Sequence, residues 1–365
     1  MKSTFGKNIT VSIWGGSHEP AIGVDIAGLP AGAQIDRREL EAFMARRAPG
    51  SSPFATKRKE PDTPVPVSGV SGDDIWTIDD TEVSFQIINT DQKSGDYKSL
   101  RTVPRPGHAD YTARIRYGTE LNMAGGGPFS ARMTAPLCIA GGIALQILKQ
   151  RGITIGAHIL SIGNVYDQPI DPVSIPDDLA DTLKSRQPIT VIDEDAGSKM
   201  AQVILAAKSE LDSVGGVIEA FVTGLPTGIG GAMYDGVESA LAPVLFGIPA
   251  VKGVEFGAGF RAAHMLGSEN NDSFYYEGGQ VRTRTNNHGG ILGGITSGMP
   301  LITRIAFKPT PSISREQDSV NLETGENEKL VIKGRHDPCV VVRAVPIVEA
   351  ALAIGLLDCM MEDNQ

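Results

Sequence analysis

The chain has 365 residues, of which 41% are hydrophobic and 21% charged, a balance typical of a soluble globular protein. A formal net charge of −10 and an aromatic content of 5% argue against a nucleic-acid partner, an anionic membrane surface and base-stacking sites. The three cysteines show no CxxC spacing, the N-terminal stretch is not apolar and no stretch approaches 18 apolar residues, so we expect a reduced, cytoplasmic protein without membrane segments.

Apolar periodicity, helix caps and β-branched runs predict alternating strands and helices. Asp36 and Glu39 form a capping-box pattern, and Pro346 suits the first position of a helix. In chain order we expect a strand over 8–14, a helix from Asp36 to Pro49, a strand over 83–89, a helix over 132–150, a strand over 153–162, a helix from about 199 to 212, strands over 217–223, 301–307 and 339–345, and a helix from Pro346 onward.

Two segments of the chain are similar to each other. "AGLPAGAQIDRRELEAF" (27–43) and "TGLPTGIGGAMYDGVESAL" (223–241) both contain a GLPxG turn followed by an acid-x-x-Glu cap and an amphipathic helix. They are either unrelated units that use common turn chemistry or the two halves of a duplication packed about a pseudo-twofold axis.

Two long polar segments, 46–62 and 311–329, are predicted to be surface loops, and long loops in compact domains are often functional. The first carries Arg46, Arg47, Lys57, Arg58 and Lys59. It is either a solvated basic loop or a lid that binds anions.

Candidate chemistry is concentrated on four turns that lie beside apolar runs. They carry Ser17 and His18; Arg105, His108 and Asp110; His288; and Arg335, His336 and Asp337. Imidazoles, guanidiniums and a carboxylate together suit general acid–base catalysis on an anionic substrate. The chain has no P-loop and no HExxH motif, and His336, Asp337 and Cys339 are too crowded for one tetrahedral metal, so no metal site is expected.

These motifs resemble those of the chorismate synthase family along nearly the whole chain. The matching blocks are the Gly15–His18 turn, the segment 105–135, "AVKGVE" (250–255), "HGGILGGITSG" (288–298), the segment 308–313 and "GRHDPC…RAVP" (334–346). The resemblance implies one α+β domain over 1–365, a β-α-β sandwich with helices between two antiparallel sheets and an internal pseudo-twofold, assembled as a homotetramer. It also implies a lyase that converts 5-enolpyruvylshikimate 3-phosphate to chorismate and phosphate by 1,4-anti-elimination with reduced FMN, the last step of the shikimate pathway.

The resemblance also implies roles for individual residues. His18 would protonate the departing phosphate, His108 would keep the reduced flavin suitably protonated, and Asp337 would exchange a proton with flavin N5. Arg47, Arg132 and Arg335 would bind anions of the substrate or cofactor, and Arg47 would also bind NADPH, a possible reductant. The residues that would hold FMN are Phe129, Ser130, Pro249, Ala250, Gly293, Lys308, Pro309, Thr310, Pro311, Ser312 and Arg335.

The sequence departs from the family pattern near the proposed flavin site. Pro128 and Phe129 stand where Arg-Ser is common, Pro249 replaces an asparagine, Pro53 replaces an arginine of the basic loop, and the usual GESHG turn is GGSHE. Each of these prolines and Phe129 removes a polar contact or a donor. The alternative function is therefore a paralogue that binds flavin or anions and has weak or no catalytic activity.

Overall fold

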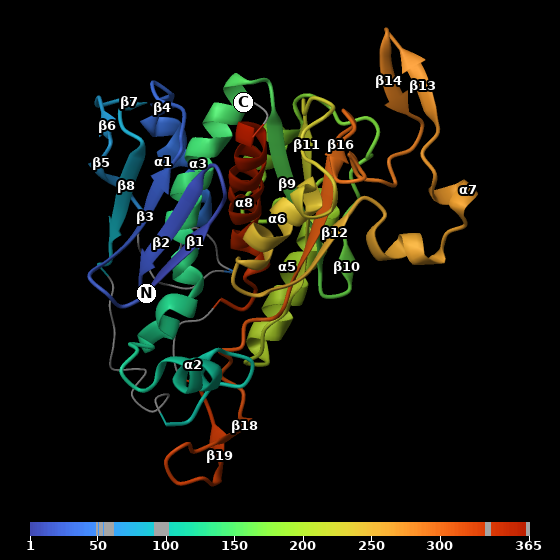
Figure 1. The fold of residues 1–365 in the computed structure, drawn as a ribbon. Helices are drawn as coiled ribbons and strands as arrows, with labels where there is room; N and C mark the ends of the chain where they lie inside the picture. Colours follow the sequence, from blue (N-terminus) through green and yellow to red (C-terminus); the bar gives the residue numbers. More distant parts are fainter. Residues whose placement is uncertain (49, 51–53, 55–61, 91–101, 333–336, 363–365) are drawn as a thin grey trace.

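The structure is a computed structural model that describes residues 1–48, 50, 54, 62–90, 102–332 and 337–362. Two five-stranded antiparallel sheets enclose a layer of helices, so the predicted α+β sandwich is confirmed (Figure 1). Helix α3 packs on the first sheet and α8 on the second, and the two helices pack on each other. The largest hydrophobic core contains residues of both sheets and of the helices between them.

The first sheet has the strand order β1-β2-β3-β8-β5. In β8, Val83, Phe85 and Ile87 are buried and alternate with more exposed residues, as expected for a strand with one face on the core. Pairing with β3 places Phe85 opposite Val24. The bounds are β1 Lys2–Phe5, β2 Thr10–Gly15, β3 Ala21–Ala27, β8 Glu82–Ile88 and β5 Val65–Ser68, with β4 Gln34–Asp36, β7 Ile75–Ile78 and β6 Val70–Ser71 in a small sheet alongside.

The second sheet has the order β10-β9-β11-β17-β12 and is covered on both faces. Ile218 and Ala220 of β11 join the main core, while Phe221 points to the other face, where it joins a small cluster that includes Leu183. The bounds are β10 Val165–Tyr166, β9 Thr154–Ile162, β11 Gly216–Thr223, β17 Leu301–Phe307 and β12 Val251–Phe256. The remaining strands form hairpins: β13 Phe274–Glu277 with β14 Gln280–Thr283, β15 Ile291–Leu292 with β16 Ile295–Thr296, and β18 Gln317–Val320 with β19 Asn327–Leu330.

The helix layer contains α1, α3, α6 and α8. At the contact of α3 with α8, a Cβ on Gly141 would lie 2.2 Å from Cβ of Ala350, so only glycine allows this close approach. The helices are α1 Arg37–Arg47, α2 Asp110–Tyr117, α3 Thr134–Gln150, α4 Leu179–Ser185, α5 Glu194–Ser209, α6 Val237–Phe246, α7 Gly267–Asn270 and α8 Val341–Glu362, with 3-10 helices η3 Ala124–Phe129, η4 Ala131–Met133, η5 Met233–Asp235 and η6 Gly259–His264.

Two helical stretches, Ala131–Gln150 and Val341–Met361, are long and apolar enough to cross a membrane, contrary to the expectation that no stretch approaches that length. In each of them 89% of the most apolar window is buried inside the protein. Their hydropathy is that of core helices, which are apolar on all sides because every side meets protein.

The structure corrects three of the predicted elements. The strand over 339–345 is wrong: α8 begins at Val341 and continues through Pro346, because core packing on both sides outweighs the β preference of the valines. The helix expected over 199–212 is α5, which runs from Glu194 to Ser209 and is capped by Asp193. The segment 311–329 contains strand β18 and the start of β19, and most of the segment 46–62 lies outside the described residues.

The two similar GLPxG segments occupy matching places in the fold. The strands that lead into them, β3 and β11, are each the third strand of a five-stranded sheet. Each segment then leads to a helix, α1 or α6, that packs on α8. These matching positions favour the duplicated-half interpretation over chance use of the same turn.

Candidate functional site

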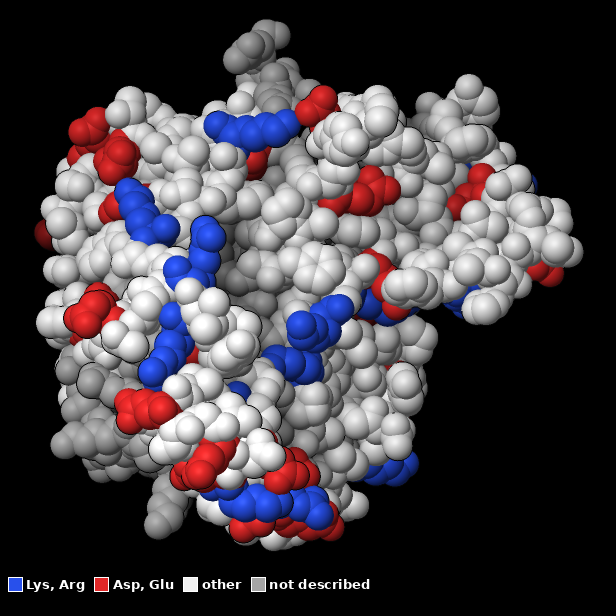
Figure 2. Space-filling model, turned by 60° about the horizontal axis from the view of Figure 1, so that its bottom comes forward, with Lys and Arg blue, Asp and Glu red and all other residues white. Residues whose placement is uncertain are grey.

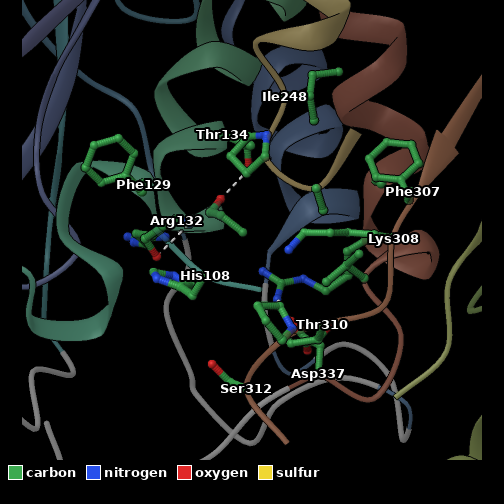
Figure 3. A pocket seen from close by; sticks show the side chains of 18 of the residues that line it. His108, Phe129, Arg132, Thr134, Ile248, Phe307, Lys308, Thr310, Ser312 and Asp337 are labelled. Atoms are coloured by element: carbon green, nitrogen blue, oxygen red, sulfur yellow. Dashed lines mark hydrogen bonds and ion pairs between the residues drawn. The ribbon is translucent and has the colours of Figure 1, made fainter. Parts of the chain in front are cut away.

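A cavity of about 340 Å³ lies at one end of the helix layer (Figure 3). Its wall is built from the end of α1, the first turns of α3 and α8, and the segments that follow α6 and β17. The N-terminal turns of helices favour anions, because their backbone dipoles place partial positive charge there. Because these elements are far apart in sequence, packing of the two sheets on the helices creates the site.

Three successive glycines bring the two candidate histidines to this cavity. Gly125, Gly126 and Gly127 have φ values of 62°, 92° and 51°, which side chains rarely tolerate. A Cβ on Gly125 would lie 2.2 Å from Cε1 of His18, and one on Gly126 would lie 3.2 Å from Nε2 of His108. His108 lines the cavity directly, whereas His18 packs behind Gly125 next to Ser17, which does line it.

His108 is held from behind by Asp110 and Arg105. Its Nδ1 lies 2.8 Å from Oδ1 of Asp110 and 3.1 Å from Nη2 of Arg105. Burial alone would raise the pKa of Asp110, but hydrogen bonds from Arg105 and His108 outweigh it and hold that pKa well below its usual range. Asp110 is therefore a carboxylate at neutral pH.

Arg47 and Arg132 both line the cavity and share one buried carboxylate, that of Asp62. The Nε of Arg47 also donates to Thr134 at 3.2 Å, and the Nε of Arg132 donates to Asn89 at 3.2 Å. Burial would raise the pKa of Asp62, but the charges of the two arginines outweigh it and lower that pKa. The predicted pair of arginines is thus brought together, by a residue that the sequence analysis did not single out.

Asp337 lies on the cavity wall and accepts a hydrogen bond at 2.8 Å from Nη1 of Arg343, in the first turn of α8. Arg343 also donates to the backbone carbonyl of Arg47 at 3.0 Å. Burial lowers the pKa of Arg343, and the nearby charge of Asp337 opposes that shift. The predicted partner of Asp337, Arg335, and its neighbour His336 lie outside the described residues.

Most of the residues expected to hold a flavin surround the same cavity. The residues of that set that line it are Phe129, Ser130, Pro249, Ala250, Lys308, Thr310, Pro311 and Ser312. Ala250 has a φ of 76°, unusual for a residue with a side chain, and Oγ1 of Thr310 is buried without a hydrogen-bond partner among the described residues. Pro309 lies within the run without lining the cavity.

Two residues from the glycine-rich segment 286–298 lie elsewhere. Gly293 is in the turn between β15 and β16, and the next residue, Gly294, packs against Gly236 at the start of α6. The cavity lies beyond the other end of α6, where it is lined by Pro249. His288 is half-buried near Asp272, and desolvation lowers its pKa. Neither residue is among those that line the cavity, so a role for Gly293 stays a prediction.

The cavity is positively charged although the protein is acidic. Among the described residues, its lining contains the cations Arg47, Arg105, Arg132, Lys308 and Arg343 and a single carboxylate, Asp337. Burial and the charge of Lys252 lower the pKa of Lys308. Figure 2 shows Lys and Arg side chains gathered around a hollow on this face of the molecule. The arrangement suits a compact ligand that carries several negative charges.

Sequence reasoning missed Asp62 and Arg343 as parts of the site, and it named Arg105 among the candidate residues without giving it a role. Arg105 and Asp110 stand in the same turn as His108, so their spacing was a usable signal. No local pattern marks Asp62, whose partners are distant in sequence. Arg343 was hidden by the wrong strand prediction, since it faces the cavity only as part of a helix.

Comparison with known proteins gives one consistent result. A family model described as chorismate synthase matches residues 9–361. The chain is 46% identical to the chorismate synthase of Lancefieldella parvula, with 99% of this chain and 96% of that protein covered, and 43% identical to that of Thermococcus gammatolerans, with 98% and 97% covered. A crystal structure titled chorismate synthase has the same fold, with a TM-score of 0.74, 22% identity, and 98% of this chain and 93% of that chain covered.

Proposed function

This chain belongs to the chorismate synthase family, and from that premise we propose that it converts 5-enolpyruvylshikimate 3-phosphate to chorismate and phosphate by 1,4-anti-elimination with reduced FMN. Members of this family are lyases of the shikimate pathway, so the chain is an enzyme. The proposed reaction would be the last step of that pathway.

The observation that carries the proposal is the charge of the cavity. The substrate has one phosphate and two carboxylates, and the cavity presents five cationic side chains against one carboxylate among its described residues. Cations still outnumber carboxylates when the buried Asp62 and Asp110, which pair with three of these arginines, are included. Guanidinium groups bind both kinds of anion through paired hydrogen bonds. Arg47 and Arg132, already held in place by Asp62, are the arginines assigned to these anions.

The remaining roles concern protons. His18, beside the cavity, would protonate the departing phosphate, and His108 would supply or hold a proton at the cofactor side. Asp337 would accept and return a proton at the cavity wall, since its carboxylate is the only acidic group among the described residues of the lining. Imidazole is suited to both histidine roles because it titrates near neutral pH.

The residues present fit FMN. The apolar side chains of Ile248, Phe307 and Ile347 can cover a flat ring, while the buried Thr310 hydroxyl lacks a partner among the described residues and Lys308 supplies a positive charge for a phosphate. Reduced FMN, when bound, would supply an electron-rich ring for an elimination that involves no net redox change.

NADPH would be a possible reductant, with Arg47 as a contact, and the enzyme would act in the cytoplasm.

The test is an anaerobic assay of the purified protein with 5-enolpyruvylshikimate 3-phosphate and chemically reduced FMN. Chorismate and inorganic phosphate should form in equal amounts, and only when FMN is both present and reduced. Equal activity with oxidised FMN, or without FMN, would contradict the proposal.

The alternative, a paralogue that binds flavin or anions with weak or no turnover, is favoured by Phe129 and Pro249, which both line the cavity in place of polar family residues. Each lost hydrogen bond to a charged group would cost about 1.5–3 kcal/mol, so FMN should bind about tenfold or more weakly than with the usual residues. Pro128→Arg combined with Phe129→Ser should tighten FMN binding in a fluorescence titration. Unchanged affinity would mean that other groups replace those contacts.

A further inference from the structure

Behind His108, Arg105 and Asp110 form a buried network to which none of the roles given above is assigned. Both oxygens of Asp110 accept hydrogen bonds at 2.7 Å, one from Nε and one from Nη2 of Arg105. The backbone N–H of Arg105 donates to the same carboxylate at 3.0 Å, and its Nη1 donates to Oγ of Ser312 at 3.1 Å. Asp110, Arg105 and Ser312 are all buried, so the network is part of the folded framework of the site.

This network decides which nitrogen of His108 carries its proton. Nδ1 has two neighbours: the carboxylate of Asp110 at 2.8 Å, which only accepts, and Nη2 of Arg105 at 3.1 Å, which only donates. The carboxylate is the nearer of the two, and Nη2 already donates to it at 2.7 Å, so the geometry favours the proton on Nδ1. In neutral His108 the lone pair is then on Nε2. The hydrogen bonds found for the His108 ring among the described residues involve Nδ1, and His108 lines the cavity. Nε2 is therefore the atom that His108 offers to a ligand.

We propose that Asp110 is a positioning residue that holds His108 in the Nδ1–H form, so that Nε2 gives and takes the proton in the cavity. Arg105 holds Asp110 in turn. When Nε2 gains a proton, the carboxylate of Asp110 stabilises the resulting imidazolium. It also offsets the positive charge of Arg105, which is the other charged group in contact with the ring among the described residues. This inference rests on the proposed function, in which His108 acts as an acid–base group.

Asp110→Asn is the test, because an amide can donate its own N–H to Nδ1 and so favour the opposite tautomer. The tautomer is read from the ¹⁵N NMR signals of the His108 ring in labelled protein without ligands, assigned by their loss in His108→Gln. These signals should have the Nδ1–H pattern in the wild type and the Nε2–H pattern in Asp110→Asn. In the anaerobic assay kcat should fall about tenfold or more with KM within about threefold. The acidic limb of the pH profile of kcat should move to lower pH, since the imidazolium loses its carboxylate.

A matched control comes from a second buried His–Asp pair. Asp167→Asn removes a carboxylate that lies 2.8 Å from Nδ1 of His158, away from the cavity, and should lower stability without changing the His108 tautomer or the pH profile of kcat. Asp110→Glu keeps the charge and should partly restore kcat.

Two results would overturn the inference. One is wild-type His108 in the Nε2–H form, a measurement that needs no variant to fold. The other is Asp110→Asn with both the tautomer and the pH profile unchanged. If the wild-type protein makes no chorismate, the proposed function fails, while the tautomer measurement still decides whether Asp110 positions His108.

Discussion

One buried carboxylate, Asp62, holds together two arginines that come from different helices. An ion that is fully removed from water is costly unless it is paired, and Asp62 is paired on both sides, with Arg47 and Arg132. Removing one charged partner of such a cluster lowers stability more than replacing all of its charged groups, because the remaining charges stay buried without a partner. The same contacts fix the positions of both guanidiniums on the cavity wall.

We therefore expect Asp62→Asn to weaken binding of 5-enolpyruvylshikimate 3-phosphate about tenfold or more, as measured by calorimetry, because an amide cannot accept fully from two guanidiniums. Glu349→Gln is the matched control: Glu349 is buried and pairs with Arg46 at 2.6 and 2.9 Å, but neither residue lines the cavity. It should lower stability and leave affinity unchanged. Tighter binding by Asp62→Asn would show that the carboxylate merely neutralises the arginines.

Asp337 poses a choice between a catalytic and a structural role, since its carboxylate accepts from Arg343. Asp337→Asn keeps the size of the side chain but cannot take a proton. A catalytic role predicts turnover lower by about two orders of magnitude with near-normal affinity for FMN and substrate. Flavin fluorescence titration and anaerobic single-turnover kinetics measure the two effects separately. Poor binding with normal turnover at saturating ligand would favour the structural role.

At the level of elements, a row of charged residues crosses three strands on the face of the second sheet that points away from the helix layer. His158 of β9 lies between Asp167 and Glu219, at 2.8 and 3.1 Å, and Arg304 of β17 donates to Glu219 at 2.8 Å. Burial would lower the pKa of His158, but the hydrogen bonds that its ring donates to the two carboxylates outweigh burial and raise that pKa. The pKa values of Asp167 and Glu219 are lowered despite their burial, chiefly by His158.

These shifts predict how the stability contributed by the row depends on pH. The contribution of His158 is complete below its unfolded pKa of 6.5 and is lost as pH rises through the higher folded value. The contributions of the carboxylates are complete above their unfolded values of 3.8 and 4.5 and are lost as pH falls through the lower folded values. The difference in Tm between wild type and His158→Gln should thus be largest at about pH 5–6 and shrink toward pH 9. A difference that grows above pH 7 would contradict the assigned shifts.

At the scale of the whole molecule, the segment 259–284, which includes α7, β13 and β14, projects from the side of the second sheet (Figure 1). It exposes large apolar side chains: Phe260 is 79% exposed and Tyr276 is 81% exposed. Large apolar side chains exposed on a projecting segment are typical of a protein–protein interface. We therefore expect this segment to form one contact between copies in the homotetramer that the family resemblance implies.

Sedimentation analysis should find a tetramer for the wild type and smaller species when Phe260→Lys and Tyr276→Lys are combined, since a lysine at each place would bury a charge in the contact. Tyr166→Lys changes an aromatic residue that is 68% exposed on β10, outside this segment, and should leave the assembly intact. A monomeric wild type, or a tetramer that survives both substitutions, would contradict the expectation.

Local patterns in the sequence predicted much of the fold. The cap at Asp36 and the apolar stripe that follows it predicted α1, and period-two or continuous apolar runs predicted β2, β8, β9, β11 and β17 within a few residues. The family resemblance named a set of site residues, and Arg47, His108, Arg132, Asp337 and most of the flavin set from it line one cavity. Such features depend on residues close in sequence, or on a resemblance carried by short motifs.

The sequence by itself thus determined the alternation of elements, the glycine run that admits two histidines, and the types of residue available for chemistry. Only the tertiary structure decided that Val341–Val345 are helical, that Arg343 faces Asp337, and that Asp62 joins Arg47 to Arg132. The physical reason is that burial and ion pairing are long-range. A valine adopts a helix when its surroundings are helices, and a carboxylate inside a protein takes the partner that packing places within reach, however distant that partner is along the chain.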